Sequence, residues 1–147
     1  MSRKVPGVRV VLDTSVLVAG LRSREGASFR LLEATIARTL VPVMSVALFL
    51  EYEAVLKRPE QRQATELTER DVDTALAALA SAAVLVDVSF RWRPQLRDPA
   101  DELVLEAAVN GQAEAIVTHN VRDFASAATA FGIRTMTPGD LLKELQR

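Results

Sequence analysis

The sequence has no cysteine, a single histidine (His119) and few aromatic residues, which make up 5% of its 147 positions. Without cysteine the chain can form neither disulfides nor thiolate metal sites, and it is compatible with a reducing cytosol. One histidine also excludes a multi-histidine zinc site within one chain. Any metal ion must therefore be held by oxygen ligands, which favours magnesium or manganese.

Other signals are also missing. No stretch reaches the roughly 18 apolar residues of a membrane helix, and Arg9 and Asp13 interrupt the first apolar run, which argues against a signal peptide. There is no glycine-rich phosphate loop and no G-x-S-x-G nucleophile motif. The net charge of −1 is not that of a protein that coats nucleic acid. We therefore expect a cytoplasmic protein that does not enter membranes.

Short β-branched runs alternate with longer helical patterns along the chain, which we interpret as one domain spanning residues 1–147. Such alternation predicts an α/β fold in which helices cover both faces of a mostly parallel, five-stranded sheet. The predicted strands are residues 8–12, 40–44, 84–88, 115–118 and 133–136. The predicted helices are residues 16–21, 27–39, 45–57, 69–83, 100–110, 123–131 and 140–145.

Acidic and amide side chains follow two of the predicted strands. Asp13 comes directly after the first strand, and Asn120 and Asp123 follow the fourth. In open parallel sheets, ligands bind beyond the carboxyl ends of the strands, where the strand order reverses. Asp13 and Asn120 can each also be helix N-caps. The place of Asp13 after a buried strand favours a function, because a partly desolvated carboxylate requires a cation or hydrogen-bond donors.

Two glutamates on the predicted 45–57 helix receive different interpretations. Glu53 has Lys57 four residues later, a spacing that stabilises pairs on helix surfaces, so we interpret it as structural. Glu51 lies on the apolar stripe of Leu48 and has no basic partner at helical spacing. A glutamate in such a place is uncommon unless it is paired or ligating, which favours a functional role.

The segment R-D-P-A-D contains two more candidate acids. Asp98 is a natural N-cap with Pro99 at the first helical position. Asp101 can be a capping-box acid, but it also heads an apolar stripe, so it is the better inward-facing carboxylate. Asp140 has the same capping spacing near the C-terminus, and His119 lacks a nucleophile or base partner. Neither receives a functional role.

Four carboxylates from different elements are expected at one end of the sheet: Asp13, Glu51, Asp101 and Asp123. They would repel one another strongly unless cations lay between them. Mg²⁺ or Mn²⁺ fits such a cluster, and it can activate water and neutralise the charge of a phosphodiester transition state. The residues therefore predict metal-dependent phosphodiester hydrolysis.

Four segments, in this order, resemble the PIN-domain family: V-V-L-D-T-S-V-L-V, L-E-Y-E-A-V-L-K-R-P, R-D-P-A-D-E-L-V-L-E-A-A and A-I-V-T-H-N-V-R-D-F. The resemblance extends from Val8 to Leu142, and more narrowly the chain looks like the VapC-type toxin components of bacterial toxin–antitoxin systems. It implies a three-layer α/β/α sandwich with a five-stranded parallel sheet. It also implies a Mg²⁺- or Mn²⁺-dependent ribonuclease site.

On this resemblance, Asp13 and Asp101 would ligate the metal, while Glu51 and Asp123 would complete the acidic cluster and orient water. Four further side chains would hold metal waters or phosphate: Thr14, Ser15, Thr118 and Asn120. Ser15 stands where the family often has asparagine, and Asn120 stands where many relatives carry an acid. The implied partners are an RNA substrate, a cognate antitoxin protein and a second copy of the chain in a homodimer.

Two alternatives remain open. A phosphatase with Asp13 as its nucleophile would generally need a second aspartate at the position of Ser15. A catalytically weak PIN module would use its acids only to bind a partner. Basic residues in predicted loops or at helix ends could form an RNA-binding rim, with Trp92 stacking on a base or anchoring its loop: Arg22, Arg24, Lys57, Arg58, Arg91, Arg93, Arg97 and Arg122.

Overall fold

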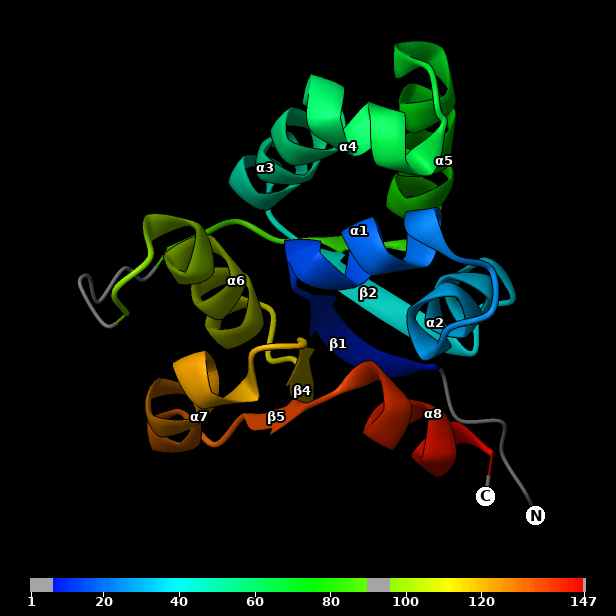
Figure 1. The fold of residues 1–147 in the computed structure, drawn as a ribbon. Coiled ribbons are helices and arrows are strands. Elements are labelled where there is room, and N and C mark those ends of the chain that lie inside the picture. The colour runs from blue at the N-terminus through cyan, green and yellow to red at the C-terminus, as the bar shows by residue number, and fades with distance from the viewer. Residues whose placement is uncertain (1–6, 90–95, 147) are drawn as a thin grey trace.

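The computed structural model describes residues 7–89 and 96–146. Arg91, Trp92 and Arg93, named above for an RNA-binding rim, lie outside the described residues. Strands and helices alternate along the chain (Figure 1). In order, the elements are β1 (Val8–Leu12), α1 (Thr14–Arg22), α2 (Ala27–Ile36), β2 (Leu40–Met44), α3 (Val46–Leu56), α4 (Pro59–Thr65), α5 (Glu69–Ala82), β3 (Val84–Leu85), α6 (Pro99–Asn110), β4 (Ala115–Val117), α7 (Val121–Ala130), β5 (Arg134–Met136) and α8 (Pro138–Leu145).

The five strands form one parallel sheet in the order β3-β2-β1-β4-β5, which confirms the predicted fold class. The central strand β1 contains Val10, Val11 and Leu12, all fully buried. A parallel strand needs this apolar sequence because helices cover both of its faces. The chain first adds β2 and β3 on one side of β1 and then returns to add β4 and β5 on the other. The strand order therefore reverses between β1 and β4.

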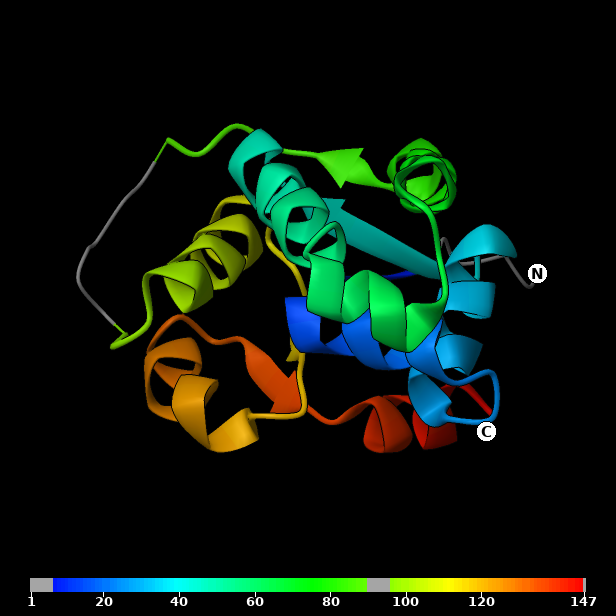
Figure 2. The same cartoon turned by 45° about the horizontal axis from the view of Figure 1, so that its top comes forward.

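The helices form layers on the two faces of this sheet. Helices α2 and α5 pack on β2 and α1 packs on β1, whereas α6 packs on β1, β2 and β4, and α7 packs on β5. Figures 1 and 2 show α6 and α7 grouped at one end of the molecule, away from α5. Among the residues that the structure describes, no helix is long and apolar enough to cross a membrane.

Several elements differ from the sequence prediction in their bounds, and α2, for example, ends at Ile36 instead of residue 39. Helix α4 was not predicted, because it is a polar helix without a buried residue and so has no apolar periodicity. It begins at Pro59, whose fixed backbone angle suits the first turn of a helix. Strand β3 is shorter than the predicted 84–88, although the N–H of Val86 still donates to the carbonyl of Met44.

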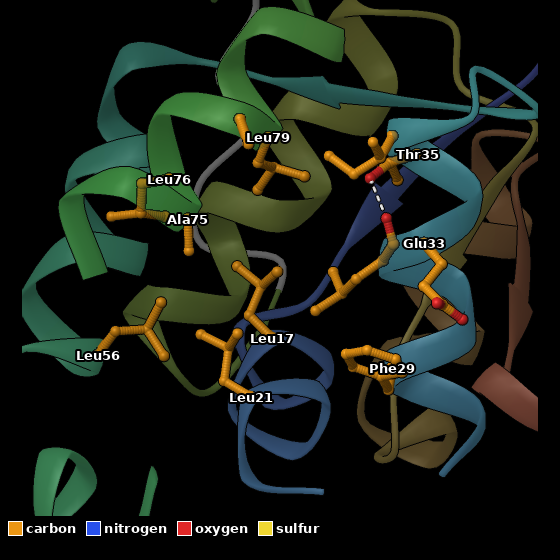
Figure 3. A pocket seen from close by; sticks show the side chains of 12 residues that line it. Leu17, Leu21, Phe29, Glu33, Thr35, Leu56, Ala75, Leu76 and Leu79 are labelled. Atoms are coloured by element: carbon orange, nitrogen blue, oxygen red, sulfur yellow. Dashed lines mark hydrogen bonds between the residues drawn. The ribbon is translucent and has the colours of Figure 1, made fainter. Parts of the chain in front are cut away.

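A hollow with a volume of about 290 Å³ lies between α1, α2, α3 and α5 (Figure 3). Leu17 and Leu21 of α1 form part of its wall, together with leucines and alanines of α5. Its one hydroxyl, on Thr35, already donates to the carbonyl of Leu32 at 2.7 Å. Because the lining is almost wholly apolar, this hollow offers no set of polar groups for catalysis or for metal binding.

The buried Tyr52 of α3 ties this helix to the end of β1. Its hydroxyl donates to the carbonyl oxygen of Leu12 at 2.5 Å, and the residue is 1% exposed. Burial raises the pKa of the Tyr52 phenol far above its usual range, and the nearby charge of Asp13 adds to this effect. The phenol is therefore a permanent donor at the last residue before Asp13.

We predict that Tyr52→Phe lowers the free energy of unfolding by about 1–2 kcal/mol, because a buried acceptor loses its partner. Urea unfolding followed by circular dichroism measures this loss. Ser81→Ala is the matched control, since it removes an exposed hydroxyl that donates to Ala78, and it should change stability by less than about 0.5 kcal/mol. Equal effects of the two substitutions would contradict the assigned role of Tyr52.

Candidate active site

Asp13 lies at the point where the strand order reverses, with only 6% of its surface exposed. Its Oδ2 accepts hydrogen bonds from the hydroxyls of Thr118 at 2.7 Å and Ser15 at 2.9 Å. Its backbone N–H donates to the carbonyl of Val117 at 2.9 Å. The side chain and the backbone of Asp13 therefore both join the end of β1 to the end of β4.

The loop between β4 and α7 orients these two hydroxyls. The N–H of Asn120 donates to Oγ1 of Thr118 at 2.9 Å, and the N–H of His119 lies 3.5 Å from Oγ of Ser15. A hydroxyl that accepts from a backbone N–H can direct its own proton to a second acceptor, here Asp13. The ring Nε2 of His119 shares a 3.1 Å hydrogen bond with Oγ of Ser28 on α2, which anchors the loop from its other side.

Asp101, in the first turn of α6, belongs to the same electrostatic cluster as Asp13. Its pKa is raised to about 7, first by burial and then by the charges of Asp13, Asp98, Asp123 and Glu102. All of these charges are negative, so each disfavours the ionised form of Asp101. A half-buried carboxylate surrounded in this way is a place where a cation would be strongly favoured.

Helix α6 begins as the sequence predicts, but with a different role for Asp101. Asp98 is the N-cap, and its Oδ1 accepts from the N–H of Ala100 at 2.9 Å, with Pro99 at the first helical position. The Asp101 carboxylate accepts no hydrogen bond from any described residue, so it does not close a capping box. A complete capping box occurs instead at Thr68 and Asp71 of α5.

A cleft with a volume of about 690 Å³ opens beside this cluster, between the N-terminal end of α6 and the length of α7. Asp98, Asp101 and Asp123 line it. Asp123 is exposed in the first turn of α7. Asp101 therefore both lines the open cleft and interacts electrostatically with the buried Asp13.

The comparison with known protein families agrees with this geometry. The family model described as PIN domain matches residues 9–122. The chain belongs to the PIN-domain family. PIN domains are a family of nucleases, which are typically metal-dependent and generally use divalent ions. A search of curated proteins found no match to this chain.

The structure links some of the predicted site residues of this PIN domain and leaves others apart. Asp13, Asp101 and Asp123 interact electrostatically, and Ser15 and Thr118 hydrogen-bond to Asp13. Three predicted site residues make no described side-chain contact with this cluster: Glu51, Thr14 and Asn120. Their roles, like those of the other five, stay predictions.

These three side chains occupy distinct places. Glu51 is half-buried on α3, one residue before Tyr52, and its charge is not among those that raise the pKa of Asp101. Thr14 is the half-buried first residue of α1. Asn120 occupies the N-cap position of α7, the structural role considered for it in the sequence analysis, but its exposed side chain makes no capping hydrogen bond.

Glu53, which the sequence analysis interpreted as structural, pairs with Lys57 at 3.0 Å.

Sequence reasoning missed two residues that support the PIN-domain site. Tyr52 fixes the end of β1, as described above, and nothing in its local sequence indicates the distant acceptor. Glu102 is 4% exposed, and its Oε1 accepts from the N–H of Leu96 at 2.7 Å, which holds the segment before α6. Glu102 and Glu106 are both buried and are four residues apart. That spacing on an apolar helix was the available signal.

The donor set of the PIN domain fits a hard divalent ion. Its candidate ligands are carboxylate oxygens, which Mg²⁺ and Mn²⁺ prefer. Within residues 7–89 and 96–146, no group of three or more acids or histidines is gathered closely enough to hold a metal ion. Mg²⁺ is commonly bound through one or two carboxylates and keeps several waters. Asp13 and Asp101 are the two predicted ligands, and the charge of Asp13 acts on Asp101.

The raised pKa of Asp101 predicts a pH-dependent stability. Between about pH 4 and pH 7 the unfolded chain loses the Asp101 proton while the folded chain keeps it, so stability falls as pH rises. Asp101→Asn removes this titration. The metal-free variant should therefore gain stability relative to wild type over this range, as thermal unfolding at several pH values would measure. Asp140→Asn, at an exposed position of α8, is the control, and a pH-independent difference for Asp101→Asn would contradict the raised pKa.

Proposed function

We propose that this PIN domain is a divalent-metal-dependent endoribonuclease that hydrolyses RNA phosphodiester bonds. The observation that carries the proposal is the pairing of Asp13 and Asp101 at the point where the strand order reverses. Asp13 is fixed there by two hydroxyls, and burial together with neighbouring negative charges raises the pKa of Asp101 to about 7. A cleft large enough for part of a nucleic acid strand opens directly beside Asp101.

The chain's own residues have separable roles in this proposal. Thr118 and Ser15 hold Oδ2 of Asp13, which leaves Oδ1 free of hydrogen bonds from the described residues. Asp13 and Asp101 would ligate the ion, Asp123 and Glu51 would complete the acidic set and orient water, and Thr14 and Asn120 would contact bound water or phosphate. When bound, Mg²⁺ or Mn²⁺ supplies an electrophile that offsets the developing charge on the phosphodiester.

The finer identity follows the sequence resemblance. We infer that the chain is the toxin of a toxin–antitoxin pair, that a cognate antitoxin protein restrains it, and that it acts as a cytoplasmic homodimer. The support is the similarity of its four motifs to VapC-type toxins. Light scattering on the purified chain tests the dimer. Growth arrest on expression, relieved by the product of a neighbouring reading frame, tests the toxin role.

We predict that Asp13→Asn abolishes Mn²⁺-dependent cleavage of single-stranded RNA while the protein stays folded. Thr118→Val should lower the rate by about 10- to 100-fold, the usual cost of removing a partner that orients a metal ligand. Thr118→Ser, which keeps the hydroxyl, should retain most of the wild-type cleavage rate. Gel-resolved cleavage with and without Mn²⁺ measures these rates.

Asp140→Asn is the matched control for this assay, because Asp140 is an exposed acid in the first turn of α8. It should cleave RNA at the wild-type rate. Undiminished cleavage by Asp13→Asn would contradict the proposal. Hydrolysis of phosphate monoesters with a phosphoryl group trapped on Asp13 would favour the phosphatase instead, and no Mn²⁺-dependent activity of any kind would favour the partner-binding module.

A further inference from the structure

Two unpaired arginines line the same cleft as the acidic cluster. Arg97 lies just before α6 and Arg122 lies in the first turn of α7, and both are exposed. Neither forms an ion pair or a side-chain hydrogen bond with any described residue, although three carboxylates line the cleft with them. An unpaired guanidinium is a ready bidentate donor to a phosphate.

Two basic residues elsewhere in the described part of the chain are held by acids, unlike Arg97 and Arg122. Lys57 lies 3.0 Å from Glu53 and 2.7 Å from Asp73. Arg134 lies 2.6 Å from Glu144. The arginines of the cleft also leave Asp101 uncompensated, because every charge that acts on its pKa is negative. The cleft is therefore lined by arginines and by carboxylates that form no ion pair with one another among the described residues.

The other described residues of the cleft wall are three apolar side chains and one hydroxyl. Leu96 comes from the segment before α6, and Ser126, Ala127 and Ala130 come from α7. Small side chains leave room between the two helices, and a volume of about 690 Å³ is within the range of sites that hold a small molecule. An apolar wall beside arginines suits a nucleobase, whose face packs on apolar surfaces and on guanidinium planes.

We infer that this cleft is a nucleotide subsite for single-stranded RNA, adjoining the bond that is cut. Arg97 and Arg122 hold a backbone phosphate, and the base packs against Leu96, Ala127 and Ala130. The inference rests on the proposed function, because Asp101 is shared by the cleft and the acidic cluster. The arginines would also offset the repulsion between the carboxylates and an incoming phosphate.

Salt-dependent RNA binding tests this subsite without relying on cleavage. Fluorescence anisotropy of a labelled single-stranded RNA is measured against KCl concentration, without divalent ions, in the full-length Asp13→Asn background. Arg97→Ala and Arg122→Ala should each weaken binding and reduce the slope of log affinity against log salt by about 0.7, as for one lost phosphate contact. Arg97→Lys and Arg122→Lys should keep the slope, because lysine keeps the charge.

Two further variants separate the base contact from general surface charge. Ala130→Leu, at an exposed position, should weaken binding by about fivefold or more without changing the slope, because it narrows the space for the base. Arg70→Ala is the control for charge, since Arg70 is exposed on α5, away from α6 and α7 (Figure 2). It should leave both affinity and slope unchanged.

The outcomes distinguish the subsite from the proposed nuclease function. If the wild type cleaves RNA but Arg97→Ala and Arg122→Ala keep the parent slope, the subsite is overturned and the nuclease stands. An equal loss of slope in Arg70→Ala also overturns it, because binding would then follow surface charge alone. If the wild type does not cleave RNA, while Arg97→Ala and Arg122→Ala reduce the slope of log affinity against log salt, the subsite stands as a binding site and the nuclease proposal fails.

Discussion

The hydrogen bond from Thr118 to Asp13 is the interaction on which the rest of the site depends. A carboxylate that is almost fully buried is costly unless donors satisfy it, and Thr118 and Ser15 supply two donors to one oxygen. Because these donors follow β4 and begin α1, the bonds fix the exits of two neighbouring strands together. The other oxygen of Asp13 is left for a ligand, at the one place in the sheet where a crevice is expected.

Electrostatics decides what this crevice favours. Each described charge that acts on Asp101 is negative, so the acids repel one another, and protonation or a cation would relieve this repulsion. Arg97 and Arg122 lie in the same cleft but do not relieve it, because they pair with none of the described acids. The acids therefore favour a divalent ion, and the arginines favour the phosphate groups that the ion's substrate would bring.

The sequence was sufficient for the fold class, because that follows from strong local patterns, while the place of the site stays a prediction. The apolar runs at β1 and β4 predicted central strands, and the acid after β1 predicted a crevice. Helix α4 was not predicted because it has no apolar face.

Contacts between distant residues could not be predicted. The hydrogen bond between Tyr52 and Leu12 joins residues 40 positions apart in the sequence. Whether Arg97 forms an ion pair with a described acid depends on the directions of the side chains, which the sequence does not specify. For Glu51, the apolar stripe in the sequence correctly indicated partial burial. The stripe gave no information on whether the Glu51 carboxylate lies close enough to Asp101 to interact with it.

The central claim is that Asp13 and Asp101 together form a site for a divalent ion, and calorimetric titration with Mn²⁺ tests it most directly. The account predicts that the wild-type protein binds Mn²⁺ and releases protons at pH 7, where Asp101 is partly protonated. Asp13→Asn and Asp101→Asn should each lose that binding, while Asp140→Asn keeps it. Equal Mn²⁺ binding by all four proteins would contradict the account.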